Sequence, residues 1–206
     1  MNKGVWKGKH AKPVLILAES HYSSIDKIGQ PVDYPTSNVI EGYLEGQQLN
    51  TKLFTKIAKC FGYSRSTAAG LYNQIYFGNY IDRFCYIGKS NPAKQIVAEN
   101  RTRLNDELVS FVNANNIEVI VCVSRLVFNN LPSEVDSDTW ITDSSGLIDI
   151  YSYSPFVSRN NCSIPFDHRI LIYGLPHLSA RKTVLSYNEI KSELSKDPLL
   201  QTLIST

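Results

Sequence analysis

The chain has 206 residues, enough to bury a substantial core within one domain. Hydrophobic residues make up 43% and charged residues 19%, which is ordinary for a folded protein and argues against intrinsic disorder. The formal net charge of +2 excludes no class of partner, so function has to be argued from motifs and their order.

The cysteines and the apolar runs exclude further classes of protein. The four cysteines lie far apart and form no CxxC pair, which argues against a zinc site or an iron–sulfur cluster. No stretch approaches the ~18 apolar residues of a membrane helix, and the lysine-rich amino terminus lacks the apolar segment of a signal peptide. We therefore expect a cytoplasmic protein with no membrane partner, no metal and no cofactor, while its oligomeric state stays open.

The first third of the chain predicts a strand between two irregular segments. Residues 1–12 form a basic arm, for which a solvated terminus is the simplest interpretation. The run Val14–Ala18 is apolar throughout, as is typical of a strand buried on both faces of a parallel sheet. Residues 23–36 combine two prolines and a glycine with polar neighbours, which predicts a long loop of the kind that often carries function. A short helix is expected over residues 37–45.

Helix and strand signals alternate after this loop. Apolar residues recur every four positions over 49–61, which predicts an amphipathic helix that ends at Gly62. Residues 75–81 predict a strand that runs into a polar corner at Asn79. Residues 93–114 make the clearest helix of the chain, because their apolar residues share one side.

The second half of the chain continues the alternation. Ile117–Val123 is the strongest strand signal, and Ser124 is placed to cap a short helix that Pro132 closes. A hairpin strand is expected over 147–153, and a further apolar strand over 169–173.

A last helix is expected from about Ser186. Alternating strands and helices with apolar strands imply an α/β fold, a three-layer α/β/α sandwich with a central, mainly four-stranded parallel sheet. Residues 13–206 are expected to form this single domain behind the basic arm.

Polar side chains follow each predicted strand at the point where it ends. They are Glu19, Ser20, His21 and Tyr22 after the first strand, Asn79 and Tyr80 after the second, Ser124 and Arg125 after the third, and His177, Ser179, Arg181 and Lys182 after the fourth. Ligands of open parallel sheets bind outside the carboxyl ends of the strands. One histidine can be a structural residue, but two of the chain's four at one edge favour a binding or catalytic site.

The order of these motifs is similar to that of a known superfamily. The segments LILAESHY, IYFGNYI, IEVIVCVSRLVFNNLP and ILIYGLPHLSA follow one another as in the uracil-DNA glycosylase superfamily. The chain most resembles members with Glu-Ser-His-Tyr in the first motif, and the resemblance covers most of its length by element order. It implies a glycosylase-like domain over residues 13–206, a role in DNA repair, and a nucleic acid or nucleobase-containing ligand as partner.

The resemblance also implies roles for the residues after the first two strands. Ser20 falls where the best-known members have the water-activating aspartate, and His21 falls on the proline that follows it. Tyr22 keeps the aromatic residue that shields the pocket beside the flipped base. Asn79 matches the asparagine whose amide pairs with the base edge.

The loop after the last strand resembles the His-Pro-Ser loop of the family. His177 and Ser179 match its histidine and serine, while a leucine replaces its proline. In the family this histidine stabilises charge that develops on the uracil carbonyl, and Arg181 lies where family residues enter the duplex. We also expect Arg181, Lys182 and the amino-terminal lysines to bind nucleic acid through its charge.

Base excision needs an extruded base and a positioned water molecule. Ser20 cannot activate water alone, so Glu19, or Glu41 from the following segment, would have to replace the aspartate. The resulting assignment is a catalytic role for Glu19, Ser20 and His177, base or ligand contacts for His21, Tyr22, Asn79 and Ser179, and nucleic-acid backbone contacts for Ser124, Arg125, Arg181 and Lys182.

Three other interpretations stay open. The missing aspartate favours a catalytically silent module that binds a nucleobase, a nucleotide or nucleic acid. A hydrolase triad could combine Ser20 with Glu19 and either His21 or His177, although the chain lacks G-x-S-x-G. A metal site using Glu19, His21, His168 and His177 is chemically possible, but no ligand spacing supports it.

Overall fold

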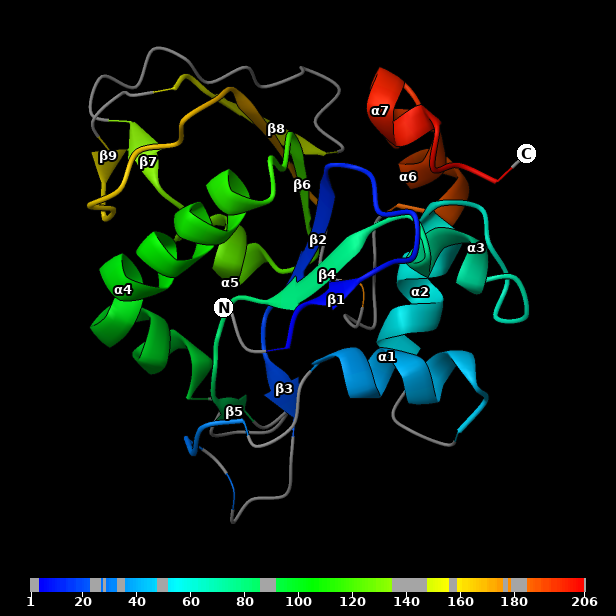
Figure 1. Cartoon of the computed structure of the whole chain (residues 1–206), viewed down its shortest axis with the longest axis horizontal. Coiled ribbons are helices and arrows are strands. Elements are labelled where there is room, and N and C mark those ends of the chain that lie inside the picture. The colour runs from blue at the N-terminus through cyan, green and yellow to red at the C-terminus, as the bar shows by residue number, and fades with distance from the viewer. Residues whose placement is uncertain are drawn as a thin grey trace.

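A computed structural model describes residues 4–22, 27, 29–32, 36–47, 52–85, 92–134, 148–155, 159–175, 178 and 185–205. A six-stranded sheet lies at the centre of the fold, with α4 and α5 against one face and the other helices against the opposite face (Figure 1). This arrangement agrees with the expected α/β fold.

The sheet consists of β1 (Trp6–Lys7), β2 (Val14–Ala18), β4 (Tyr76–Asn79), β6 (Val119–Cys122), β8 (Asp149–Tyr153) and β10 (Ile170–Gly174). Their order across the sheet is β1-β4-β2-β6-β10-β8. The four central strands are parallel to one another, and β1 and β8 are antiparallel edge strands. The first and third predicted strands are therefore neighbours, and the segment predicted as a hairpin strand forms an edge of the main sheet.

Strand β2 supplies side chains to the two hydrophobic cores. Val14, Ile16 and Ala18 pack in the core that contains α1, α2 and α6. Leu15 and Leu17 pack in the core that contains α4 and α5. Because every residue of β2 is buried, the strand carries no polar side chain until it ends.

The described helices are α1 (Thr36–Leu44), α2 (Lys52–Cys60), α3 (Ala69–Tyr72), α4 (Ala93–Ala114), α5 (Arg125–Phe128), α6 (Tyr187–Leu194) and α7 (Pro198–Gln201). The predicted bounds of α4 are confirmed, and Gly62 follows α2 with a φ of 84°. Ser186 caps α6 in a capping box with Glu189. Within the described ranges, no helix has both the length and the apolar character needed to cross a bilayer.

Two short pairs of strands lie outside the main sheet. β3 (His21–Tyr22) pairs in parallel with β5 (Phe84–Cys85), and β7 (Ser133–Glu134) pairs with β9 (Arg159–Asn160) in the antiparallel sense. Figure 1 shows β3 and β5 below the main sheet, at the end toward which β2 runs.

The described part of the predicted 23–36 loop is tied to the segment before β5. Pro31 forms an antiparallel bridge with Arg83, whose Nη1 donates to the carbonyl oxygen of Gly29 at 3.0 Å. Arg103 of α4 donates to the two carboxylate oxygens of Asp82 at 3.1 and 3.3 Å. These contacts hold the segment that contains residues 82–85 between the loop and α4.

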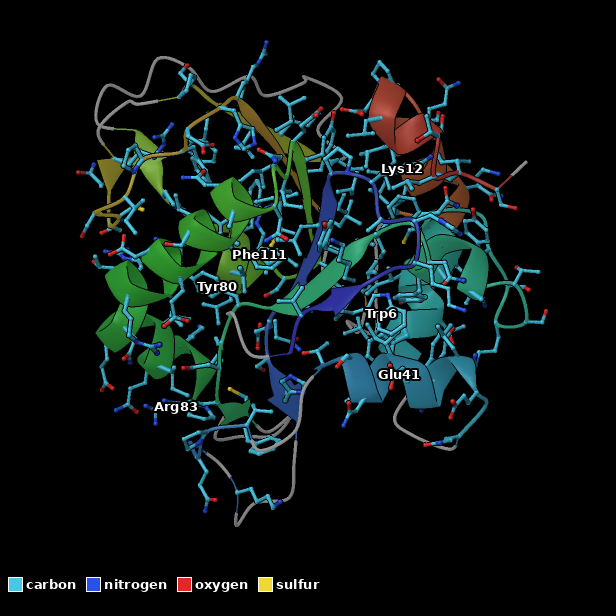
Figure 2. The ribbon with its side chains drawn as sticks, viewed as in Figure 1. Trp6, Lys12, Glu41, Tyr80, Arg83 and Phe111 are labelled. Carbon is cyan, nitrogen blue, oxygen red and sulfur yellow. The ribbon has the colours of Figure 1, made fainter. Side chains whose placement is uncertain are left out.

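In the described part of the expected basic arm, residues 4–12, Trp6 and Lys7 form an edge strand of the sheet, so this part is not simply a solvated terminus. Trp6 is 9% exposed and its Nε1 donates to the Tyr72 carbonyl oxygen at 2.7 Å. Lys12 donates to the carbonyl oxygen and the hydroxyl of Thr202 at 3.0 and 2.7 Å. Both side chains are labelled in Figure 2. A two-residue strand is too short to show periodicity, so the sequence contained no signal for it.

Replacing Trp6 tests whether this segment belongs to the core. We expect Trp6→Ala to lower the free energy of unfolding by about 3–5 kcal/mol, because the change leaves a cavity beside the sheet. Lys9→Ala is the control, since Lys9 is exposed on the same segment and should change the value by less than about 0.5 kcal/mol. Urea unfolding measures both variants. If both variants changed the free energy of unfolding by the same small amount, the segment would not stabilise the fold.

Candidate functional site

The order of the strands identifies where a ligand site is expected. The chain passes from β2 to β4 on one side of β2 and then to β6 on its other side. Helix α1, which follows β2, packs on one face of the sheet, and α5, which follows β6, packs on the other. In open parallel sheets, ligands bind outside the carboxyl ends of the strands at such a reversal of strand order. The first polar residues beyond these two strands are Glu19 and Ser124.

Glu19 and Ser124 form a buried hydrogen bond at this position. Ser124 Oγ donates to Glu19 Oε2 at 2.8 Å, and the two residues are 1% and 8% exposed, respectively. The same hydroxyl accepts from the backbone nitrogen of Val127 at 3.3 Å, so Ser124 caps α5 as predicted. Ser124 therefore orients the carboxylate, and the expected contact between its hydroxyl and a phosphate stays a prediction.

A buried hydroxyl and two buried thiols surround Glu19. Ser20 is 6% exposed, and its Oγ makes no hydrogen bond of ordinary geometry within the described ranges. Burial raises the pKa of the Cys85 thiol and the charge of Glu19 raises it further, while the Ser20 hydroxyl lowers it. Burial likewise raises the pKa of Cys122 to about 12, with a smaller contribution from Glu19. Both thiols are therefore protonated at neutral pH, and neither is an activated nucleophile.

A second polar group joins the ends of β3 and β4 to the start of α1. His21 Nε2 lies 3.0 Å from Asn79 Nδ2 and 3.0 Å from Thr36 Oγ1. Asn79 Nδ2 lies 3.3 Å from the same hydroxyl. The three residues form a closed triangle of hydrogen-bonding atoms, which we call the amide triangle. Chain continuity through residues 19–21 places it next to Glu19.

His21 is neutral at physiological pH. Burial lowers the pKa of its imidazole from 6.5 to about 4. The ring of Phe84 faces it edge-on, with 6.4 Å between the ring centroids. Because an amide nitrogen only donates, a neutral His21 Nε2 accepts the bond from Asn79.

Thr36 is a site residue that sequence reasoning missed. It is 4% exposed and is the first residue of α1, next to the predicted start of that helix. Hydroxyl residues are common at helix starts, so the residue type at this position gave no sign of a binding site. Its contact with His21 depends on how α1 packs against β3, which a single sequence does not reveal.

Other predicted site residues lie apart from these groups or outside the described ranges. Arg125 is exposed, with its guanidinium 5.9 Å from the centroid of the Phe128 ring. Tyr22 pairs with Cys85 through the backbone, and its side chain is outside the described part of the structure. His177, Ser179, Arg181 and Lys182 also lie outside the described residues.

Within residues 176–184, which belong to the loop after β10, the structure describes Leu178. This residue is 1% exposed and packs in the core that contains α1 and α2. Lys56 of α2 donates to its carbonyl oxygen at 2.5 Å. The two sequence neighbours of Leu178 are predicted site residues, so Lys56 holds the middle of the loop that contains them.

The remaining alternatives differ in how well they fit this geometry. The hydroxyl of Ser20 makes no hydrogen bond to His21, so the described residues do not form a Ser–His pair. His168 Nε2 contacts the Ile117 carbonyl oxygen, beside the amino end of β6 and at the opposite edge of the sheet from Glu19. Among the described residues, no three metal-ligating side chains lie together.

Glu41 and the amino-terminal lysines also lie away from the amide triangle. Glu41 is exposed on α1 (Figure 2), five positions after Thr36 and so about 140° around the helix from it. Lys7 pairs with the first residue of β4, and Lys12 lies just before β2. These two lysines are therefore near the amino ends of the strands, whereas Glu19 follows a carboxyl end.

No protein-family model and no curated protein sequence matches the chain, so the site has to be interpreted from its own geometry.

The buried imidazole predicts a specific loss of stability in acid. Between pH 6.5 and about 4 the unfolded chain binds a proton at His21 that the folded chain does not, so the free energy of unfolding falls as the pH falls through this window. At about 1.4 kcal/mol per pKa unit, the loss approaches roughly 3 kcal/mol. Below about pH 4 this contribution no longer changes.

The measurement is the free energy of unfolding of the wild type and of His21→Gln at a series of pH values. The difference between the two proteins removes the titration of all other groups. We expect the wild type to lose stability relative to the variant from pH 6.5 to 4. Parallel profiles would contradict a buried, neutral His21.

Proposed function

We propose that the chain is a uracil-DNA glycosylase-like protein whose site binds a damaged or modified base extruded from DNA. The observation that carries the proposal is the position of two polar groups, one buried and one half-buried, at the reversal of strand order. One is the carboxylate of Glu19, held by Ser124, and the other is the amide of Asn79, held by His21 and Thr36. The resemblance of the strand-end motifs to that superfamily supports the same conclusion.

Asn79 is the residue proposed to recognise the base. An amide offers both a donor and an acceptor, which suits the Watson–Crick edge of a base removed from the stack. The amide nitrogen is bonded to His21 and Thr36, so the carbonyl oxygen is left to accept from a ligand. The neutral His21 ring adds no charge that would repel a donor on the base.

Glu19 is the residue proposed to position water if the protein excises the base. One carboxylate oxygen accepts from Ser124, which leaves the other to accept from a water molecule. Water adds to the sugar carbon as the bond to the base breaks, and the departing base carries the electron pair of that bond. His177 is the proposed donor to this charge, by the resemblance of its loop.

A catalytically silent base-binding module is the second candidate. Ser20 stands where the best-known members carry the water-activating aspartate, and its buried hydroxyl makes no hydrogen bond of ordinary geometry with the described residues. A site with this residue keeps the means to recognise a base but lacks the usual general base. Whether Glu19 can position water then distinguishes an active glycosylase from the silent base-binding module.

Single-turnover excision separates the roles proposed for Glu19, His177 and Asn79. We expect Glu19→Gln to slow excision by about 10²–10⁴-fold, as for loss of a general base. His177→Ala should slow it by about 10²–10³-fold, as for loss of one donor to the developing charge. Asn79→Ala should instead reduce discrimination between bases by about 1–3 kcal/mol, because it removes a partner of the base edge.

The substrates are matched single- and double-stranded oligonucleotides that each contain one uracil or one damaged base, with strand cleavage at the resulting abasic site as readout. Glu41→Gln and Asn38→Ala are the controls, because both residues are exposed on α1, and both variants should retain wild-type rates. Binding of the wild type without excision of any base selects the silent module. If the wild type neither binds nor excises any base of the panel, the proposed function is rejected.

A further inference from the structure

The hydroxyl of Ser124 has one hydrogen, and its surroundings decide where that hydrogen goes. The backbone nitrogen of Val127 lies 3.3 Å from Ser124 Oγ and supplies the hydrogen of that contact, so the hydroxyl accepts there. The hydrogen of the hydroxyl is then left for Glu19 Oε2, at 2.8 Å. Ser124 can therefore hold the carboxylate as long as α5 begins at this position.

The position of α5 depends on packing, because a helix of four residues is not stable alone. Its residues Val127 and Phe128 are 0% and 3% exposed, and both pack in the core that contains α4. The backbone nitrogen of Phe128 donates to the Ser124 carbonyl oxygen at 2.9 Å. A displacement of the Phe128 ring would thus move the turn that carries the Ser124 hydroxyl.

The Phe128 ring lies against Gly174, the last residue of β10. A β-carbon at position 174 would lie 2.6, 2.7 and 2.7 Å from three atoms of the ring, well inside the ~3.5 Å at which nonbonded carbon atoms meet. The backbone of Gly174 has little room to retreat, since it pairs with Cys122 of β6 on one side and with Asp149 of β8 on the other. Gly174 does not have a positive φ, so the ring, and not the backbone angle, requires a glycine.

We infer that Gly174 and Phe128 are positioning residues that fix the Glu19 carboxylate through Ser124. The contact at the end of β10 sets the place of α5, and α5 places the Ser124 hydroxyl that donates to Glu19. Strand β6 lies between β10 and β2, so no residue of β10 has to touch Glu19. The effect on excision rests on the proposed function, whereas the packing of these four residues does not.

Fine positioning matters because Glu19 is proposed to place a water molecule. A side chain of its length has several rotatable bonds, and a displacement of about 1 Å at a reacting group can cost about 10²-fold in rate. Ser124 fixes one carboxylate oxygen and thereby the direction of the other. The size of residue 174 would thus control the reaction from β10, two strands away from β2 in the sheet.

A size exchange between Gly174 and Phe128 tests the contact. We expect Gly174→Ala to slow single-turnover excision by about 10–100-fold at saturating oligonucleotide, because its methyl group displaces the ring and with it Ser124. Phe128→Leu should also slow excision, because it leaves a gap beside the glycine. The double variant should recover much of the lost rate, since the methyl group then occupies that gap. A double variant that is no faster than Gly174→Ala would overturn the inference.

Gly174→Ala in a Glu19→Gln background tests whether the contact acts through the carboxylate. Glu19→Gln already lacks the proposed general base, so Gly174→Ala should not slow it further. A further slowing of the same size would mean that Gly174 acts on another part of the site, and the inference would be wrong. Asn129→Ala is the control, because Asn129 is exposed at the end of α5 and its variant should keep the wild-type rate.

Ser124 supplies matched variants for the intermediate step. Ser124→Thr keeps a hydroxyl that can accept from Val127 and donate to Glu19, so its rate should stay close to that of the wild type. Ser124→Ala removes the donor and should slow excision by about 10–100-fold, the usual effect of leaving a buried charged group without its hydrogen bond. A wild-type rate in Ser124→Ala would contradict the step from α5 to Glu19 and with it the inference.

Urea unfolding tests the packing without any substrate. Ser124→Ala should lower the urea midpoint more in the protein with Glu19 than in Glu19→Gln, because a buried charge without its donor costs more than a neutral amide. Gly174→Ala should lower the midpoint less in the Ser124→Ala background than in the wild type, because the bond to Glu19 is already lost there. An additive shift in either comparison would show that these residues do not act together, against the inference.

Failure of the proposed function gives a different pattern of results. If the wild type excises no base, the effect on catalysis fails together with the proposed function. The urea midpoints then still decide whether Gly174 and Phe128 hold Glu19 through Ser124.

Discussion

The burial of β2 on both faces is the constraint on which the rest of the site depends. All five of its residues are buried, and its backbone is paired with β4 on one side and β6 on the other. Polar side chains are excluded along its length because neither face reaches water. They can begin only where the strand leaves the sheet, and the chain uses the first three positions after Ala18 for Glu19, Ser20 and His21.

The carboxylate at that position is costly for the fold. Removing a charged group from water costs on the order of several kcal/mol, and a hydrogen bond to a charged group returns about 1.5–3 kcal/mol. Glu19 receives such a bond from Ser124, and its other close neighbours include the uncharged thiols of Cys85 and Cys122. Stability alone therefore does not explain a glutamate at this position, which strengthens the case for a role in binding or chemistry.

The sequence predicted the parts of the structure that depend on periodicity or on strand ends. The strand Val14–Ala18, the helix over 93–114 and the cap at Ser124 each have a local signal. The meeting of Glu19 with Ser124 followed from one further rule, that parallel strands end at the same edge of a sheet.

What the sequence could not reveal depends on contacts between distant elements or on very short ones. Thr36 reaches His21 only because α1 begins against β3, and β3 and β1 each have two residues, too few for any pattern. The Cys85 thiol lies beside Ser20 for the same reason, since a two-residue strand places it there.

The pairing of β3 with β5 also limits how the chain can change in length. The segment that contains Asn79 continues directly into Phe84, which pairs with His21, so one short stretch supplies both the amide and the support for the imidazole that holds it. Arg83 and Asp82 anchor the middle of this stretch to the neighbouring loop and to α4. An insertion or deletion between residues 79 and 84 would shift the amide relative to its support. The spacing from Asn79 to Phe84, together with a hydroxyl residue at position 36, is therefore a compact signature for recognising other proteins that share this site.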